Sequence, residues 1–243
     1  MNILSYYRRE NEVDTVVRFI PELIEEAPQH KRQILLWVWI DLVQPVSMEC
    51  KPKFSDAFEN VETLIQDGLE KSLDLTYCGS IVQEDGAAFY FYGHTAKGFE
   101  KASQQVLKEY NYDTGSSKDK HWKQYVFGIY PDALNLQLME DAEIINNLEK
   151  SGDNLTCERE VEYYFYGTSR DDLEKMCSWL NDQGFAHKDN FFNENEKKYH
   201  FGMLCTREQP INFMEMYDIT RGLFEYCNDN GLKYIGWGTK LCD

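Results

Sequence analysis

The sequence has little of what a membrane or secreted protein needs. Its longest wholly apolar run covers residues 34–40, far short of the roughly 20 residues that cross a bilayer as a helix. The first thirty residues are charged throughout and contain no apolar core of a secretory signal. We therefore expect a protein without membrane contact, located in the cytoplasm.

The common motifs of catalysis and cofactor binding are also missing. Gly93–Gly98 has two glycines flanking four residues, but Phe99 and Glu100 stand where a phosphate-binding loop needs Lys and Ser or Thr. The five histidines fall in different predicted elements and have no i, i+4 partner, so nothing local predicts a metal site. We expect no catalytic residue, no cofactor and no metal.

The cysteines do not form a recognisable framework. They number seven, which is odd, and no two of them make a C-x-x-C pair, so neither a disulfide scaffold nor a structural zinc site is indicated. Several fall beside apolar residues within predicted strands or helices, where a thiol behaves as a small buried hydrophobe. We expect buried, inert thiols in a reducing compartment at Cys78, Cys157, Cys177, Cys205 and Cys227.

Acidic residues are in excess in this sequence. Asp and Glu number 42 against 25 Lys and Arg, giving a net charge of −17, and 42% of the residues are hydrophobic. The hydrophobic content is enough for a folded core, while the negative field repels phosphate backbones. We expect a globular protein that does not bind nucleic acid directly.

Hydrophobic periodicity predicts two successive units of βαββαβ order. In the first, an apolar strand at 34–42 precedes a helix at 54–69, strands at 75–82 and 87–92, a helix at 95–110 and a strand at 121–130. A further helix follows Pro131, and residues 150–154 have the composition of a linker. The predicted first domain is therefore 1–150, an α+β domain of unknown function.

The second unit repeats this order. A strand at 157–166 is followed by a helix capped at Ser169, strands at 185–188 and 197–205, a helix after Pro210 and a strand at 232–237. The predicted second domain is 155–243. We assign both domains to the α+β class, as ferredoxin-like sandwiches whose antiparallel sheets carry helices on one face.

The face of the second sheet without helices is the candidate partner-binding surface. Strand alternation places Glu160, Glu162, Tyr164 and Tyr166 on it. Tyrosines are enriched at interfaces, and paired carboxylates attract an Arg- or Lys-rich partner. Equally, the open faces of the two domains could pack together.

From about residue 158 to 240 the chain resembles the RraB family, acidic regulators of ribonuclease E activity. The resemblance is carried by Val161–Tyr166, by Leu180–Phe185 with its Gly-Phe end, and by Tyr234-Ile-Gly-Trp-Gly238, where the family has Tyr-Asp-Gly-Trp-Gly. It adds Tyr234 and Trp237 to the candidate surface. The alternative for this segment is a strand ending in a glycine turn against which Trp237 packs. The first 150 residues resemble a bacterial family of unknown function that is often fused ahead of such domains, through Ile34–Leu42 and Ala87–Gly93.

The resemblance implies a non-catalytic protein that binds a ribonuclease with a basic segment and inhibits or modulates it. The excess of acid agrees with such a partner. The alternative is a small-molecule sensor or uncharacterised enzyme, with a pocket between the two domains lined by tyrosines and Trp237.

Overall fold

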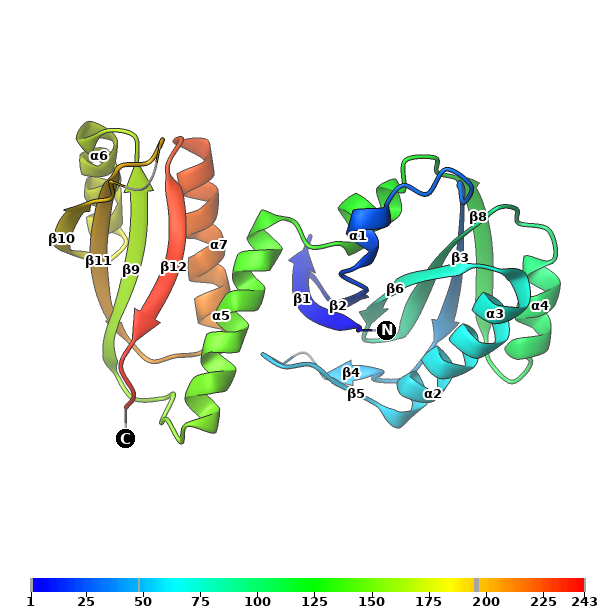
Figure 1. Cartoon of the computed structure of the whole chain (residues 1–243). Helices are drawn as coiled ribbons and strands as arrows, with labels where there is room; N and C mark the ends of the chain where they lie inside the picture. Colours follow the sequence, from blue (N-terminus) through cyan, green and yellow to red (C-terminus); the bar gives the residue numbers. More distant parts are fainter. Residues whose placement is uncertain (1, 48, 195–196, 243) are drawn as a thin grey trace. The chain divides into compact units, whose positions relative to one another are not determined.

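The computed structural model describes residues 2–47, 49–194 and 197–242, which form a mixed α/β protein with antiparallel sheets (Figure 1). Its contacts divide it into two units, Met1–Asn135 and Leu136–Asp243. This division differs from the expected one at 150–155. The reason is helix α5 (Ala133–Lys150), whose buried Asp141 accepts a hydrogen bond from Thr220 of the second unit.

The first unit is built on one six-stranded antiparallel sheet of order β1-β2-β6-β7-β3-β8. A separate short pair, β4 (Val46–Ser47) with β5 (Lys53–Phe54), precedes the first long helix. The strands of the main sheet are β1 (Leu4–Glu10), β2 (Val13–Phe19), β3 (Ile34–Asp41), β6 (Thr76–Gln83), β7 (Gly86–Gly93) and β8 (Tyr112–Lys118).

One face of this sheet carries helices α2 (Asp56–Ile65) and α4 (Phe99–Val106). Phe58 of α2 stacks on Phe89, and Phe99 of α4 meets Phe91 edge-on. Ser55 caps α2 by accepting from the Phe58 amide. Shorter helical segments of the unit include α1 (Leu23–Glu26), a π-helical turn at Gln66–Glu70 and α3 (Lys71–Leu73).

The N-terminal hairpin β1–β2 is absent from the sequence-based prediction. Its turn places Asn11 and Glu12 at positive φ (48° and 65°), the conformation of a tight hairpin turn. The sequence has no Asn-Gly or Asp-Gly pair at this turn, so it carries no local signal that predicts a hairpin there. The hairpin extends the sheet by pairing β2 with β6.

The predicted strand at 121–130 is wrong. Residues 124–129 form a π-helical turn, and the last strand is the polar segment 112–118 instead. Trp122, Tyr125 and Ile129 are buried at helical spacing, and Trp122 stacks on Tyr92 at 4.2 Å, away from the face that holds Phe91. Residues 112–118 form a strand despite their polar side chains, because an edge strand is stabilised by backbone hydrogen bonds, here to β3. The first sheet is therefore covered in part on both faces.

The second unit has a four-stranded antiparallel sheet of order β10-β11-β9-β12. The helices of this unit are α6 (Arg170–Asp182) and α7 (Phe213–Asp229), which lie on one face of the sheet, with α5 beside α7 (Figure 1). Ser169 caps α6 by accepting from the Asp172 amide, as predicted. The strands are β9 (Arg159–Gly167), β10 (Ala186–Phe192), β11 (Phe201–Gln209) and β12 (Lys233–Thr239), in the predicted succession but with shifted ends.

Among the described residues, no helix is both long and apolar enough to cross a membrane.

Candidate functional site

Strand β9 separates its side chains as the alternation predicts. Val161, Tyr163 and Phe165 are fully buried under the helices. The other face carries the four predicted residues, of which Glu160 is exposed and the rest half-buried: Glu160, Glu162, Tyr164 and Tyr166. Strand β11 continues this open face, since Leu204 is paired with Tyr164 and Thr206 with Glu162.

The two carboxylates share a lysine that the sequence analysis did not select. Lys188 Nζ lies 2.5 Å from Glu160 Oε1 and 2.6 Å from Glu162 Oε1. Lys188 is on β10, and β11 lies between β10 and β9, so the side chain spans a whole strand. It stands where the β10–β11 register slips, between His187 and Asp189. Only strand pairing brings these charges together, so no local sequence signal could have found the contact.

These contacts set the ionisation of the face. The Lys188 ammonium, and after it the Tyr164 hydroxyl that donates to Glu162 at 2.7 Å, hold the pKa of Glu162 below its usual range. The same carboxylate raises the pKa of Tyr164, and the two carboxylates raise that of Lys188. Glu162 is therefore a carboxylate at neutral pH, already paired with a cation from its own chain.

Tyr166, at the other end of β9, is fixed by aromatic and polar contacts. Its ring meets Phe191 edge-on at 5.5 Å, and its hydroxyl accepts from Asn193 Nδ2 at 3.2 Å. Phe191 lies over Gly202, where an added Cβ would fall 2.1 Å from the ring. This end of the face is apolar, whereas the Glu160 end is charged.

Tyr234 and Trp237 do not belong to the open face, so their assignment to it is corrected. Each is only 5% exposed. The β12 register slips between Tyr234 and Gly236, leaving Ile235 as an extra residue, and Gly236 has φ +130°. Because of this bulge, Tyr234 opposite Phe165 and Trp237 opposite Tyr163 both point toward the helices. Trp237 is thus packed in the interior, as the alternative interpretation has it, but the segment is a bulged strand that continues to Thr239 and does not end in a glycine turn.

A hollow of about 430 Å³ lies at the charged end of the open face. Glu160, Glu162 and Tyr164 line it from β9, and Gly238 leaves room on β12, since a Cβ there would meet nothing within 4 Å. Segment 240–242 forms its end wall. The site therefore combines carboxylates, an aromatic ring and free space.

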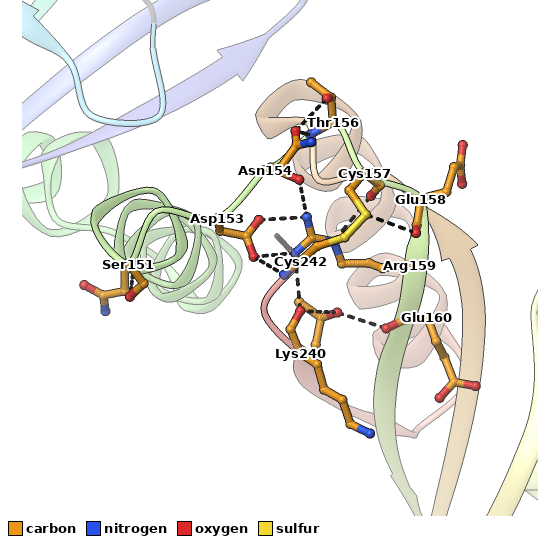
Figure 2. A network of polar contacts seen from close by, with 12 residues as sticks. Ser151, Asp153, Asn154, Thr156, Cys157, Glu158, Arg159, Glu160, Lys240 and Cys242 are labelled. Atoms are coloured by element: carbon orange, nitrogen blue, oxygen red, sulfur yellow. Dashed lines mark hydrogen bonds and ion pairs between the residues drawn. A yellow bond between two sulfur atoms is a disulfide. The ribbon is translucent and has the colours of Figure 1, made fainter.

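The end wall is fixed by a nearly buried ion pair, drawn in Figure 2. Arg159 donates from both terminal nitrogens to the two Asp153 oxygens, each at 2.7 Å, and it also donates to the carbonyls of Asn154, Cys157 and Lys240. Asp153 also accepts from the Cys242 amide at 2.8 Å. The hydrogen bonds from Arg159 are the largest cause that holds the pKa of the Asp153 carboxyl below its usual range, because the guanidinium stabilises the charged form, and the Cys242 amide adds to this effect.

Cys157 and Cys242 are joined by a disulfide, which corrects the expectation of an inert buried thiol at 157. Cys157 is half-buried and precedes β9, and Cys242 follows β12, the neighbouring strand. The two cysteines are 85 residues apart in the sequence, so their pairing has no local signal. Cys78, Cys205 and Cys227 are buried thiols as expected, and Cys177 is a half-buried thiol.

A second hollow of about 520 Å³ lies between α6 and the outer strands β10 and β11. Leu173, Phe201 and Met203 form its apolar lining, and Arg170 and His187 contribute polar groups. Within the described part of the chain, no group of three or more His, Cys, Asp or Glu side chains is arranged to hold a metal ion.

Two family comparisons match the two regions of the chain. Residues 5–127 match the model of a family of unknown function, DUF695. The chain belongs to this family. Residues 138–239 match the family described as regulator of ribonuclease activity B (RraB), so the C-terminal resemblance is confirmed and includes all six predicted site residues. The match begins within α5, as the second unit does.

Other comparisons add little. No curated protein matches the chain. A crystal structure of an unknown protein from Galdieria sulphuraria covers 87% of this chain and 99% of its own, at 11% identity and a TM-score of 0.23. A score that low carries no argument about fold or function.

Proposed function

We propose that the protein is a non-catalytic regulator that binds a basic segment of a ribonuclease and inhibits or modulates it. One observation carries the proposal: Glu160 and Glu162 stand side by side on the open face of β9, within the region that matches the RraB family. The net charge of −17 favours a basic partner over an RNA.

The geometry suits an arginine better than a lysine. Lys188 already supplies one point charge to both carboxylates, and an exposed pair of this kind is easily exchanged. A guanidinium can contact a carboxylate through two parallel hydrogen bonds and stack on an aromatic ring, which an ammonium cannot do. An arginine entering the hollow would reach Glu162 and the Tyr164 ring together, while Gly238 leaves space for its side chain.

Three further assignments belong to the same proposal. The strand order of the second unit, with two helices on one face, supports a ferredoxin-like sandwich there, and strands β3, β6, β7 and β8 of the first unit have the same relative order. The regulator family supports a role without catalysis. The proposal also places the protein in the cytoplasm, where a ribonuclease partner would be found.

The test compares three immobilised proteins: the natural chain, the double variant Glu160→Lys/Glu162→Lys, and the control Asp182→Lys/Asp229→Lys. The control changes the net charge equally but at exposed ends of α6 and α7. Each is exposed to nuclease-treated lysate of the source cell, and retained proteins are identified by mass spectrometry. The natural chain and the control should retain a ribonuclease that is released at high salt. Both proteins should also decrease the rate at which this ribonuclease cleaves RNA.

The Glu160/Glu162 variant should do neither. Equal retention by all three proteins would remove these carboxylates from the interface. Retention of no ribonuclease would reject the regulator role itself.

A second candidate function is small-molecule sensing, favoured by the hollow of about 520 Å³ beside α6. Its size lies within the range of ligand pockets, and it combines an apolar lining with Arg170 and His187. It lies within the second unit and does not involve Trp237, unlike the inter-domain pocket expected from the sequence. A small molecule that binds there should shift the Met203 methyl NMR signal of the natural chain. The absence of this shift in Arg170→Leu would favour the sensing function.

A further inference from the structure

The Cys157–Cys242 disulfide, drawn in Figure 2, joins the residues that precede β9 to the segment that follows β12. Its Cα atoms are 6.4 Å apart, a normal separation for a disulfide. Cys242 belongs to the end wall of the hollow, on which Lys240 and Leu241 also lie. A change at this bond therefore acts directly on the shape of the candidate binding site.

Hydrogen bonds also hold Cys242 near the residues that precede β9. The Asn154 amide donates to the Cys242 carbonyl at 2.8 Å, and the Cys242 amide donates to Asp153 at 2.8 Å. Arg159 Nη1 donates both to the Lys240 carbonyl at 3.3 Å and to Asp153 at 2.7 Å. After reduction these contacts keep segment 240–242 near Cys157 but allow it more motion than the disulfide does, so the bond can form again.

The environment of this pair differs from that of the other thiols. Burial raises the pKa values of Cys78, Cys205 and Cys227, which makes their thiols unreactive. Cys157 and Cys242 are both half-buried and lie next to the Arg159 guanidinium, whose Nε donates to the Cys157 carbonyl. Because they are only half-buried, these two side chains lie within reach of a small disulfide in solution, unlike the buried thiols.

We propose that Cys157 and Cys242 are a reversible redox pair that controls the order of segment 240–242. In oxidation, one thiolate attacks a low-molecular-weight disulfide such as oxidised glutathione and displaces one thiol. The second thiolate then displaces the other, leaving the protein disulfide and two glutathione thiols. The two electrons and two protons given up by the cysteines thus reduce glutathione. In a reducing compartment a disulfide of this kind is a transient sensor and not a permanent support.

The consequence for binding rests on the proposed function. With the bond formed, the end wall is fixed and the hollow beside Glu160 and Glu162 is preorganised, which lowers the entropic cost of binding a basic segment. With the bond reduced, segment 240–242 is held by hydrogen bonds alone. The oxidised form is therefore the stronger binder.

The first measurement concerns the pair itself. The full chain is equilibrated with mixtures of reduced and oxidised glutathione, its thiols are alkylated, and the mass of the peptides containing 157 and 242 is determined. One two-electron transition within the range of these mixtures is expected, and it should persist in the control Cys177→Ser. A pair that stays oxidised in all mixtures, or reduced in all, overturns the proposal.

The second measurement concerns the wall. Amide hydrogen exchange at 240–242 should be about tenfold faster in the reduced protein and in Cys157→Ser/Cys242→Ser, with no change in β1 and β2 of the first unit. Equal exchange in both redox forms overturns the control of this segment. The double variant also shows that the effect belongs to these two sulfur atoms.

Binding of an octa-arginine peptide at low salt then separates this proposal from the proposed function. The oxidised chain should bind it several-fold more tightly than the reduced chain. Equal, measurable binding by both forms would overturn the redox effect on binding while supporting the acidic face. Binding by neither form would count against the acidic face, whereas the glutathione and exchange measurements would still decide the redox pair.

Discussion

The Asp141 carboxylate on α5 accepts a hydrogen bond of 2.5 Å from the Thr220 hydroxyl on α7, although the two residues are 79 positions apart. Gln137 donates to the other carboxylate oxygen at 3.1 Å, and both Asp141 and Thr220 are buried. This contact ties α5 to the second unit. It also places a carboxyl group where ionisation is costly, because the surroundings exclude water.

Stability of the second unit should depend on the ionisation of Asp141. Burial raises its pKa from 3.8 to about 6, against the opposing effect of its hydrogen bonds. The folded chain therefore holds this proton more tightly than the unfolded chain. The stabilisation is complete below pH 4 and is lost as the pH rises through about 6, by roughly 2–3 kcal/mol.

The variant Asp141→Asn removes this dependence, because an amide does not ionise. Relative to the natural chain, it should gain roughly 2–3 kcal/mol in unfolding free energy between pH 4.5 and pH 7.5. Urea unfolding followed by the Met203 and Met216 methyl NMR signals reports on this unit. The exposed control Asp182→Asn should show no such gain, and a flat difference for Asp141→Asn would contradict the role of burial.

Glu62 should be essential to the first unit. Arg18 donates to both of its carboxylate oxygens, at 3.0 and 2.8 Å, and the buried Tyr77 hydroxyl donates at 2.9 Å. Glu62→Ala leaves a largely buried guanidinium and a phenol without their acceptor, which should cost about 3 kcal/mol. Glu59→Ala, on the exposed side of the same helix, should cost less than about 0.5 kcal/mol.

Native-state hydrogen exchange of the β6 amides measures the stability of this unit separately from the second. Similar costs for the Glu62 and Glu59 variants would show that the Arg18–Glu62 pair contributes no net stability.

The bulge in β12 should require glycine at 236. Its φ of +130° is unfavourable for any side chain, and an added Cβ would lie 3.2 Å from Gln137 Nε2. Gly236→Ala should therefore cost about 1–3 kcal/mol. Gly238→Ala is the matched control, because its Cβ would meet nothing within 4 Å and its cost should stay within about 0.5 kcal/mol.

The comparison is made by urea unfolding of the full chain, monitored by NMR signals of β9 and β12. If both alanine variants lose the same stability, the bulge geometry is not the reason that these glycines are present.

Removal of Lys188 should release the two carboxylates of β9. In Lys188→Gln the pKa of Glu162 should rise toward its usual value, since the ammonium is the largest cause of its lowering. Octa-arginine should then bind more tightly at low salt, because the internal competitor is gone. Lys175→Gln on α6 changes the net charge equally and should change neither property.

Carboxyl NMR titration measures the pKa, and fluorescence anisotropy the peptide affinity. An unchanged Glu162 pKa in Lys188→Gln would mean that the ion pair does not persist in solution.

Features that depend on neighbouring residues follow from the amino-acid sequence alone. Alternation assigned Val161, Tyr163 and Phe165 to the core and Glu160 to the open face, and Ser169 marked the start of α6. Side-chain direction in a strand alternates from one residue to the next, and a helix cap involves residues two or three positions apart. Both can therefore be read from neighbouring residues. They were sufficient for the succession of elements in the second unit.

Contacts between residues that are distant in sequence become visible only in the folded chain. The bulge at Ile235 turns both Tyr234 and Trp237 inward, Lys188 crosses a strand to reach Glu160, and Cys242 meets Cys157 only because β12 lies beside β9. In the first unit, the stacking of Trp122 on Tyr92 accompanies a helical turn where periodicity predicted a strand. Strand register and long-range packing fix these contacts, and neither is encoded in the spacing of neighbouring residues.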